Sequence, residues 1–553
     1  MPKNNAENFI NSHFSEMYSK HAFTRTGFSN LKTYLGKQVK GNSKIYTAPF
    51  AKGESMDKVL SDWMKTLQSI DEQWPSLYNF EKDLANKVGP MSIQKPLSQR
   101  FEDISHYWDD ILLPSKPISA EAISQTVKEF SKCGSLRLRS VKDTVDRMKK
   151  STSSGSPFMT KRRNCVRDTV PCYTIAYGGR HPSVSSWIHG KDWYSPAVVG
   201  WRGQEGGPEK DDVKQRVIWM FPFSVNINEL QVYQPMIEQF QKFNLVPAWV
   251  SMDAVDKRIT DLFDSKSRDD LVVCTDFSKF DQHFNPDMQN AARTIISSLL
   301  ARGRVSDNWI RDTFPAKYFI PLCWEAFTDD YGDDKITVFA GQHGMASGSG
   351  GTNADETLVH RALQHEVALL HNQTLNPNSQ CLGDDGILSY PGITVEDVVE
   401  AYQSHGQECN IDKQYASTQD CVYLRRWHHN DYRENGICVG VYSTCRALGR
   451  LRYLERYMDP EYWSPEAVAL RQLSIIENCN HHPLREKFAE FCMKRDRYRL
   501  GIDIPGFLDD LGHIAQEFID HMPDFLGYTK TLQGEGPEGI TDWWIVKYLK
   551  SHR

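Results

Sequence analysis

Two acidic strand ends constrain this chain more than any other feature. The β-branched run at 271–275 predicts a buried strand, and Asp276 follows it directly. Two short apolar runs within 380–389 flank Gly383-Asp384-Asp385, a pattern typical of a hairpin with acids at its turn. If these strands are neighbours in one sheet, three carboxylates meet at its end.

Such a cluster of carboxylates suits Mg²⁺, which prefers hard oxygen ligands. Nucleotidyl transfer uses two Mg²⁺ ions roughly 3.5 to 4 Å apart, one at the attacking 3′ hydroxyl and one at the incoming triphosphate. We therefore expect two Mg²⁺ ions, with Mn²⁺ as a substitute, held mainly by Asp276 and Asp384 and supported by Asp385. Asp281, on the turn after Asp276, is expected to face the nucleotide ribose.

The tripeptide Gly-Asp-Asp occurs twice, so on its own it is weak evidence. The first copy, Gly332-Asp333-Asp334, lies in FTDDYGDDKITVFA beside two more acids and predicts an exposed hairpin turn. The second copy, at 383–385, lies between apolar runs and follows both DFSKFD at 276–281 and SGSGGTN at 347–353. Glycines in the latter segment let a backbone approach template and nucleotide closely. We therefore assign the metal site to the second copy.

The order DFSKFD, SGSGGTN, GDD resembles the palm motifs A, B and C of viral RNA-dependent RNA polymerases. The phrases DFSKFDQH and ASGSGGTNADETL, and the chain length, are most similar to the enzymes of picobirnaviruses, which have double-stranded RNA genomes. The resemblance rests on motifs between residues 150 and 430. It implies an α+β right-hand fold of fingers, palm and thumb, with an antiparallel palm sheet, a helix-rich thumb, encircling fingertips, and initiation without a protein primer.

Composition and pattern divide the chain along similar lines. Residues 151–224 are rich in Gly, Pro, Ser, Arg and Lys, which favours long functional loops, and the pattern after 440 is mainly helical, as at Ser464-Pro465. The expected parts are an N-terminal region bridging fingers and thumb (1–130), fingers and fingertips (131–265), a palm with a fingers insertion (266–430), a thumb (431–527) and a C-terminal tail (528–553).

The resemblance extends to nucleotide-binding residues. Lys214 and Arg216 in KQRVI are similar to the core of motif F, with Arg202 as an earlier member, and cations there would neutralise triphosphate charge. An exposed basic loop is the alternative. Lys413 matches the motif D lysine, which by resemblance protonates pyrophosphate, or it is a solvated surface lysine. The motif B residues expected to position template and nucleotide are Ser347, Thr352 and Asn353.

Glu356 departs from the family pattern. In many of these polymerases motif B carries an Asn at this position, which pairs with the second motif A Asp to sense the ribose 2′ hydroxyl. Here Asn353 lies three residues earlier, near the same face of the expected helix. A carboxylate facing Asp281 needs a proton or an intervening cation. We expect sugar selection by Asp281, with its partner left open.

Other segments are candidates for RNA contact. TSSGSP at 152–157 resembles motif G beside the incoming template, and YLRR at 423–426 resembles motif E, which grips the primer strand. An amphipathic strand is the alternative for the second segment. Arginines after motif E suit the RNA backbone, with solvated charge as the competing interpretation. The RNA-binding candidates are Ser154, Gly155, Pro157, Arg425, Arg426, Arg446 and Arg450.

Two further features, a pair of C-terminal tryptophans and a Cys/His cluster, lie outside these motifs. Trp543 and Trp544 near the C-terminus either fold back to hold an initiating nucleotide or pack on the thumb. Cys479, His481 and His482 lack a fourth ligand at normal zinc spacing, which disfavours a zinc site.

Bulk properties narrow the class of protein further. A formal net charge of −6 argues against a uniformly basic RNA-coating protein. The 12 cysteines form no CxxC pair and favour reduced thiols, and no signal-peptide or membrane-spanning run is present. The expected partners are viral RNA template and product and nucleoside triphosphates, with the capsid protein as a candidate. The expected location is the virion interior and the host cytoplasm.

Two rival functions share part of this sequence pattern. A reverse transcriptase shares the palm carboxylates, but those enzymes place a bulky residue where Asp281 stands. A non-catalytic RNA-packaging or capsid protein with a decayed polymerase fold predicts the loss of at least one metal acid, and all three are present.

Overall fold

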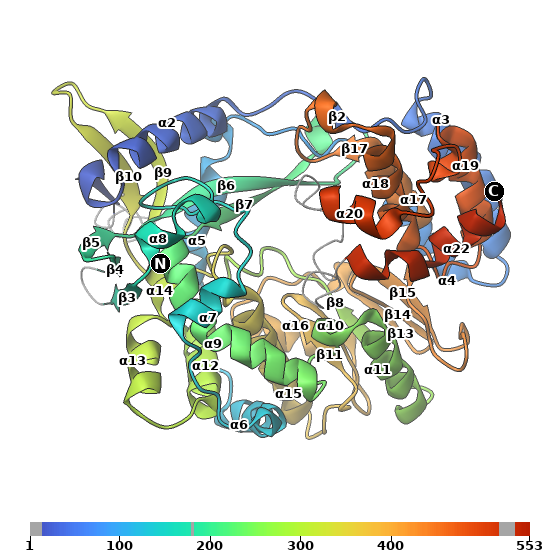
Figure 1. The fold of residues 1–553 in the computed structure, drawn as a ribbon. Helices are drawn as coiled ribbons and strands as arrows, with labels where there is room; N and C mark the ends of the chain where they lie inside the picture. The colour runs from blue at the N-terminus through green and yellow to red at the C-terminus, as the bar shows by residue number, and fades with distance from the viewer. Residues whose placement is uncertain (1–13, 179–181, 519–536) are drawn as a thin grey trace.

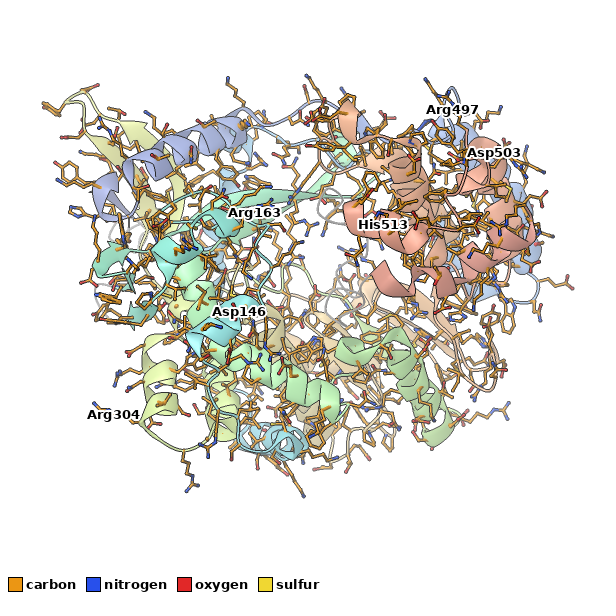
Figure 2. All side chains as sticks on the ribbon, viewed as in Figure 1. Asp146, Arg163, Arg304, Arg497, Asp503 and His513 are labelled. Atoms are coloured by element: carbon orange, nitrogen blue, oxygen red, sulfur yellow. The ribbon has the colours of Figure 1, made fainter. Side chains whose placement is uncertain are left out.

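The computed structural model describes residues 14–178, 182–518 and 537–553 (Figure 1). Its elements form three groups around the middle of the molecule, which we term the palm (bottom of the view), the fingers (left) and the thumb (right). Charged side chains of both signs lie at the periphery, with Arg304 at one edge and Arg497 and Asp503 at the opposite one (Figure 2). The 12 cysteines are buried free thiols. In the three ranges just given, no helix is long and apolar enough to cross a membrane.

The palm is built on a four-stranded antiparallel sheet in the order β11 (Gln380–Leu382), β12 (Asp385–Leu388), β8 (Val272–Thr275) and β13 (Tyr415–Ser417). Strand β8 is buried along its whole length, as its β-branched sequence predicts. Strands β11 and β12 form the predicted hairpin, and β12 pairs directly with β8. The condition set by the sequence, that the two acidic strand ends are neighbours in one sheet, is therefore met.

Helices share one apolar core with the palm sheet. Two of their starts carry residue types that are typical helix caps in a sequence: the side chains of Asn285 and Thr394 accept hydrogen bonds from Met288 N and Asp397 N, each at 3.1 Å. The palm helices are α6 (Ala120–Phe130), α11 (Met252–Ser265), α12 (Pro286–Leu299), α15 (Thr352–Leu370) and α16 (Val395–Ser404).

The fingers carry a five-stranded sheet in the order β1 (Phe14–Tyr18), β10 (Asp334–Phe339), β9 (Leu322–Thr328), β6 (Ala197–Gln204) and β7 (Lys214–Met220). Strands β9 and β10 leave the palm between β8 and β11 in sequence, so they form a fingers insertion within the palm segment. Gly332-Asp333-Asp334 lies in their exposed connecting turn, which confirms the surface-turn prediction for the first Gly-Asp-Asp copy.

A second fingers sheet and seven helices complete this part of the molecule. The sheet strands are β3 (Cys172–Tyr177), β4 (Ser183–Ile188) and β5 (Lys191–Tyr194). The helices are α2 (Arg25–Lys40), α5 (Phe101–Asp109), α7 (Val141–Asp146), α8 (Val166–Thr169), α9 (Phe223–Lys242), α13 (Arg304–Asp312) and α14 (Ala316–Phe319), and the short α10 (Pro247–Val250) leads from α9 to the palm.

The thumb is mainly helical, as the sequence pattern predicts. Its helix α18 begins at Pro465 after the capping residue Ser464, in agreement with the predicted start. A three-stranded sheet, β14 (Asp420–Tyr423), β15 (Arg426–His429) and β16 (Val441–Tyr442), joins it to the palm. The thumb helices are α17 (Thr444–Arg452), α18 (Pro465–Glu477), α19 (Arg485–Arg495), α20 (Leu511–Phe518) and α22 (Trp544–Ser551).

The N-terminal region contributes to the cores of all three parts. Helices α2 and α5 belong to the fingers core and α6 to the palm core. Helices α3 (Met56–Leu67) and α4 (Pro75–Ala85) pack in the thumb core, where Trp63 Nε1 donates to Thr444 Oγ1 at 2.7 Å. A short ladder between β2 (Tyr46–Thr47) and β17 (Tyr453–Leu454) adds a second link to the thumb. The domain boundaries themselves stay predictions.

Candidate active site

The three aspartates lie at one end of the palm sheet. Gly386 pairs with Thr275, so one step further along the same antiparallel register sets Asp385 opposite Asp276. Asp384 occupies the two-residue turn between β11 and β12, next to both. Asp276 and Asp384 are exposed, whereas Asp385 is partly buried. The sheet therefore brings the predicted acids together, with two of them open to a ligand.

Helix α15 holds the turn that carries Asp384. Gly383 has a φ of +57°, the left-handed region that favours glycine, and its N–H donates to Thr357 Oγ1 at 2.9 Å. His360 Nδ1 lies 2.8 Å from the Gly383 carbonyl, which can only accept, so Nδ1 carries the proton. Burial lowers the pKa of His360 to about 4, which keeps the ring neutral. Sequence reasoning missed Thr357 and His360, although both lie one or more turns after Asn353 on the same helix face.

Two further contacts fix the other acids. The amide side chain of Gln414 spans the backbone of Asp276: Gln414 Oε1 accepts from Asp276 N and Gln414 Nε2 donates to Asp276 O, both at 2.8 Å. Leu424 N donates to Asp385 Oδ2 at 2.8 Å, which ties this carboxylate to the β14–β15 turn. Neither contact has a sequence signal, because each joins residues far apart in the chain.

Burial and neighbouring negative charges raise the pKa values of two acids in this cluster. Burial raises the pKa of Asp385 to about 7, and the neighbouring Asp384 carboxylate adds to the rise. Asp384 is reached by solvent, but the protein around it removes much of its hydration, and this desolvation followed by the charge of Asp281 also raises its pKa. Within the described parts of the chain, no three His, Cys, Asp or Glu side chains are already drawn together into a metal cage. A cation brought by substrate phosphates would relieve the repulsion between these acids.

Asp281, Arg216 and Glu356 form a charged group beside this cluster. Arg216 Nη2 lies 3.3 Å from Asp281 Oδ2. Glu356 is only 4% exposed, and burial followed by the charge of Asp281 raises its pKa well above the ordinary value. This rise in pKa favours a protonated Glu356 that can donate to Asp281 over an intervening cation. Asn353 Oδ1 accepts from Trp249 Nε1 at 2.9 Å, leaving its amide nitrogen toward the Gly383 turn.

The glycine-rich segment before α15 presents Ser347 to this site. The Ser347 hydroxyl is buried within the protein and, among the described residues, no hydrogen-bond partner is found for it. Thr352 Oγ1 closes the loop by donating to Ala346 O and Ser349 O at 3.2 and 3.3 Å. Thr352 thus shapes the loop, and Ser347 is the member of the predicted set with an unused hydroxyl.

The predicted cationic residues lie on the paired strands β6 and β7. Arg202 stands opposite Arg216 in the ladder, and Lys214 is two residues before Arg216 on the same exposed face. Arg216 reaches Asp281, but Arg202 Nη2 pairs with Glu455 Oε2 of the thumb at 3.1 Å. Lys413 is exposed and directly precedes Gln414, at the edge of the acidic cluster. Nucleotide binding by these residues stays a prediction.

Several RNA-binding candidates lie in the interior of the protein. The Arg426 guanidinium is buried, and its Nη1 pairs with Asp256 at 3.3 Å while its Nη2 donates to Gly440 O at 2.9 Å. Ser154, Gly155 and Pro157 are also buried, and RNA contact by these four residues stays a prediction. A Cβ on Gly155 would lie 2.5 Å from Phe221 O.

The remaining RNA-binding candidates keep part of their surface. Arg425 is exposed, in a hairpin turn where both Leu424 and Arg425 have positive φ. Arg446 Nε and Arg450 Nη1 face Glu205 of the fingers, at 3.3 and 3.6 Å, so these arginines bridge thumb and fingertips. RNA binding by these three arginines stays a prediction.

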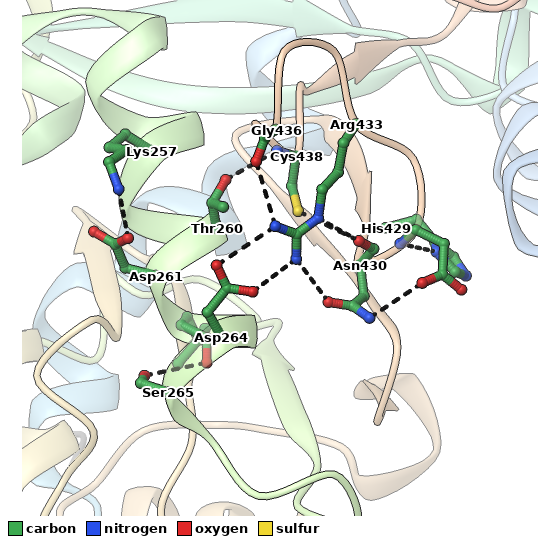
Figure 3. Close-up of polar contacts among 12 residues, drawn as sticks. Lys257, Thr260, Asp261, Asp264, Ser265, His429, Asn430, Arg433, Gly436 and Cys438 are labelled. Atoms are coloured by element: carbon green, nitrogen blue, oxygen red, sulfur yellow. Dashed lines mark hydrogen bonds and ion pairs between the residues drawn. The ribbon is translucent and has the colours of Figure 1, made fainter.

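The connection between β15 and β16 is fastened to the palm by Arg433 (Figure 3). Arg433 Nη2 lies 2.8 Å from Asp264 Oδ1 on α11 and donates to Asn430 Oδ1 at 3.0 Å. Cys438 N donates to Thr260 Oγ1 of the same helix at 2.9 Å. These contacts fix the end of β15 that lies away from the Leu424–Arg425 turn.

The ambiguous C-terminal features are explained by thumb packing in the residues described. Ile545 N donates to Glu477 Oε2 at 2.9 Å, and α22 belongs to the thumb core together with Trp543 and Trp544. The part of the predicted tail from 528 to 536 lies outside the described residues. Of the residues considered for zinc, His482 bonds Glu81 and His481 bonds Glu434, each at 2.9 Å.

Comparisons with known proteins agree with this geometry. The family model described as viral RNA-dependent RNA polymerase matches residues 119–437. A human picobirnavirus protein named "Potential RNA-dependent RNA polymerase" is 55% identical over 529 residues, covering 95% of this chain and 97% of that protein.

Two crystal structures are also similar to this chain. They show the RNA-dependent RNA polymerase of a human picobirnavirus (TM-score 0.90, 53% identity) and its insertion-loop deletion mutant (TM-score 0.88, 51% identity). Each match covers 97% of this chain and 99% of the chain in the crystal structure. They confirm the expected α+β right-hand architecture.

Proposed function

The chain belongs to the viral RNA-dependent RNA polymerases, and from that premise we propose that it copies viral RNA by two-metal nucleotidyl transfer at Asp276, Asp384 and Asp385, starting without a protein primer. Its substrates are an RNA template and nucleoside triphosphates. The observation that carries the proposal is the adjacency of the three acids at the end of the β8–β12 ladder, facing the basic strand β7 through the Arg216–Asp281 pair.

The acids fit the metal ions that the proposal requires. All three offer hard oxygen donors, and Asp276 and Asp384 are accessible. Burial, followed by the charge of a neighbouring aspartate, raises the pKa values of Asp384 and Asp385. Mg²⁺ in polymerase sites is usually bound by one or two carboxylates together with substrate phosphates, so a closed protein cage is not needed. When bound, two Mg²⁺ ions, or Mn²⁺ in their place, would activate the 3′ hydroxyl and neutralise charge on the triphosphate.

The chain's own residues supply binding, orientation and proton transfer. Arg216 and Lys214 would hold the triphosphate from the exposed face of β7, and Ser347 would use its free hydroxyl to orient template or nucleotide. Asp281, with a neutral Glu356 beside it, would accept a hydrogen bond from the ribose 2′ hydroxyl. Lys413 would give a proton to the pyrophosphate leaving group.

Extension of an RNA primer on an RNA template tests the proposal. The purified protein with Mg²⁺ should extend the primer with ribonucleotides, and the double variant D384A/D385A should lose the activity to background. The matched control is D333A/D334A in the exposed β9–β10 turn, which should remain fully active. Activity that is lost in D333A/D334A and survives in D384A/D385A would overturn this assignment.

Two variations of the assay address the finer parts of the proposal. Product formed on a linear single-stranded template without any primer or added protein supports initiation without a protein primer, and an absolute need for a primer contradicts it. Replacing ribonucleotides by deoxyribonucleotides tests the reverse transcriptase rival, because Asp281 in place of a bulky residue should favour ribonucleotides.

Location and capsid attachment form a separate part of the proposal. We place the enzyme inside the virion and in the host cytoplasm, with the capsid protein as a partner. The support is the likeness to a picobirnavirus polymerase alone. Nuclease-treated, purified particles should contain this chain in a protease-protected form, and its absence from such particles would contradict the proposal.

A further inference from the structure

The glycine-rich loop at 347–351 is pressed against the fingers by close backbone contacts. A Cβ on Gly348 would lie 1.6 Å from Trp219 O of β7, and a Cβ on Gly351 would lie 2.3 Å from the Tyr233 ring of α9. Only glycine tolerates such approach, so the loop's position is set by what the fingers present to it.

A buried carboxylate from helix α9 grips this loop. Glu229 is completely buried; its Oε2 accepts from the Ser349 hydroxyl, and its Oε1 accepts from Gly350 N at 3.2 Å. The Ser349 hydroxyl in turn accepts from Gly351 N at 3.0 Å, at the start of α15. Glu229 thus satisfies donors in the middle of the loop whose first residue, Ser347, carries the unused hydroxyl.

Asn226, one helical turn before Glu229, completes the grip. Its amide nitrogen donates to Gly348 O and to Glu229 Oε1, both at 3.1 Å. Its amide oxygen accepts from Arg162 Nη2 at 2.8 Å, and Arg162 comes from the loop beside TSSGSP. The Arg162 guanidinium also lies over the Phe223 ring, 5.3 Å from its centroid, which fixes its direction.

A second buried cluster contacts helix α9 through Tyr233. Lys317 and Asp355 are completely buried and pair at 3.0 Å, and Tyr233 of α9 donates to Asp355 Oδ1 at 2.6 Å. Asp355 lies in the first turn of α15. Helix α9 is therefore also fixed to α15 through Tyr233, at a contact separate from the hydrogen bonds of Glu229 to the loop.

We propose that Glu229 and Asn226 are positioning residues for nucleotide addition: they hold the loop at 347–351, and with it Ser347, in place after Met345, whose N–H donates to Asp281 O at 2.8 Å. The inference rests on the proposed polymerase reaction. The energetic reason is that a reacting group misplaced by about 1 Å costs on the order of 100-fold in rate. Buried hydrogen bonds hold a loop more firmly than glycine backbone alone can.

Variants at Glu229 and Ser349 test the proposal by nucleotide kinetics on a fixed primed template. E229A should lower kcat/KM for the nucleotide by about 10- to 100-fold with unchanged affinity for RNA. E229Q should stay within about threefold of the unmodified chain, because an amide keeps an acceptor for Gly350 N and a polar partner for the Ser349 hydroxyl, and burial already raises the pKa of Glu229. The control E238A, on the same helix but paired with Arg139 and Arg147, should remain unchanged.

Coupling between the two positions separates positioning from general destabilisation. S349A should lower kcat/KM by about 3- to 10-fold, and adding S349A to E229A should cost little more, because both remove one interaction. If E229A fails to fold, S349A alone tests the grip, because it removes the same hydrogen bond and leaves Glu229 in place.

Three outcomes overturn the proposal. One is kcat/KM within twofold of the unmodified chain for both E229A and S349A; another is fully multiplicative effects in the cycle. The third is E229Q falling as far as E229A with an equal drop in thermal midpoint. If the unmodified chain itself extends no primer, the proposed function fails instead, so the two failures are distinguishable.

Discussion

Glu356 offers the sharpest test at the scale of single residues. The raised pKa of Glu356 favours a protonated carboxyl that donates to Asp281, so a glutamine there should preserve its role. We expect E356Q to keep nucleotide kcat/KM within about threefold and to keep the preference for ribonucleotides. E356V removes the donor; since hydrogen bonds to charged groups contribute about 1.5–3 kcal/mol, that preference should fall by about tenfold or more. The measurement is kcat/KM for GTP and dGTP on one template.

The outcome that contradicts this view is equally specific. If E356Q loses ribonucleotide preference as E356V does, Glu356 acts in its ionised form and needs a cation beside Asp281. A glutamine at the exposed Glu400 serves as the control and should change neither substrate's kcat/KM.

Arg425 and Arg426, which are adjacent, show what a sequence motif alone cannot predict. Arg425 and Arg426 match the same motif, yet Arg425 is exposed at a turn and Arg426 is buried against Asp256. Alternation along a strand can indicate that the two side chains point to opposite faces. This alternation cannot indicate which face contacts a buried carboxylate, because Asp256 lies on α11, far from Arg426 in the sequence.

At the scale of elements, the capping of α17 predicts a measurable pH dependence. Glu81 of α4 is completely buried, and its oxygens accept from Thr444 N at 2.8 Å, Cys445 N at 3.1 Å and His482 Nε2 at 2.9 Å. Burial alone raises the Glu81 pKa, but the bonds from His482 and its neighbours outweigh it and lower the pKa to about 2.

The sign of the effect follows from that lowered pKa. In the unfolded chain Glu81 takes up its proton near its ordinary pKa of 4.5, before the folded protein does, so stability is lost as pH falls from about 4.5 towards 2. The contribution is on the order of 3 kcal/mol at neutral pH. Denaturant unfolding of the unmodified chain and E81Q should show a gap at pH 7 that closes towards pH 2. A gap that persists at low pH would contradict the assignment, and E121Q on the exposed face of α6 should show none.

Much of the palm could be predicted because its signals are local. The buried run before Asp276 and the caps Asn285 and Thr394 are short patterns that the structure confirms. The choice between the two Gly-Asp-Asp copies also followed from neighbouring residues, since only the second lies between apolar runs.

The parts that could not be predicted depend on contacts between distant segments. Gln414 meets Asp276, and Glu229 meets Ser349, across more than a hundred residues each. His360 is visible only once α15 and the β11–β12 hairpin are known to touch. Chemistry-bearing residues were thus predicted, whereas the side chains that hold them in place were not.

For the whole molecule, ion pairs between fingertips and thumb close the ring around the site. Arg202 pairs with Glu455, and Arg446 and Arg450 pair with Glu205, beyond the reach of any shared core. The Arg202–Glu455 pair is partly exposed and contributes about 0–1 kcal/mol to stability. Arg446 and Glu205 are only 12% and 11% exposed, so loss of Glu205 would leave a buried cation without its partner and cost more.

Removing the partly exposed pair should therefore loosen the contact between fingertips and thumb without unfolding the protein. We expect E455Q to shorten RNA products under single-binding conditions and to speed hydrogen exchange in β6 and β7, with little change in thermal midpoint. The exchange difference should shrink at about 1 M salt, where the Debye length is about 3 Å. Identical product lengths would contradict this role, and D509N, which removes the surface pair with Arg553, is the control.

The joint thumb core of early and late segments also dictates when the molecule can finish folding. Helix α3 leaves the ribosome hundreds of residues before α17 and α19, which carry the partners of Trp63: Thr444, Phe488 and Phe491. Its apolar face therefore stays without these partners until α19 has been translated. During that time an exposed apolar surface favours binding of a nascent chain by chaperones.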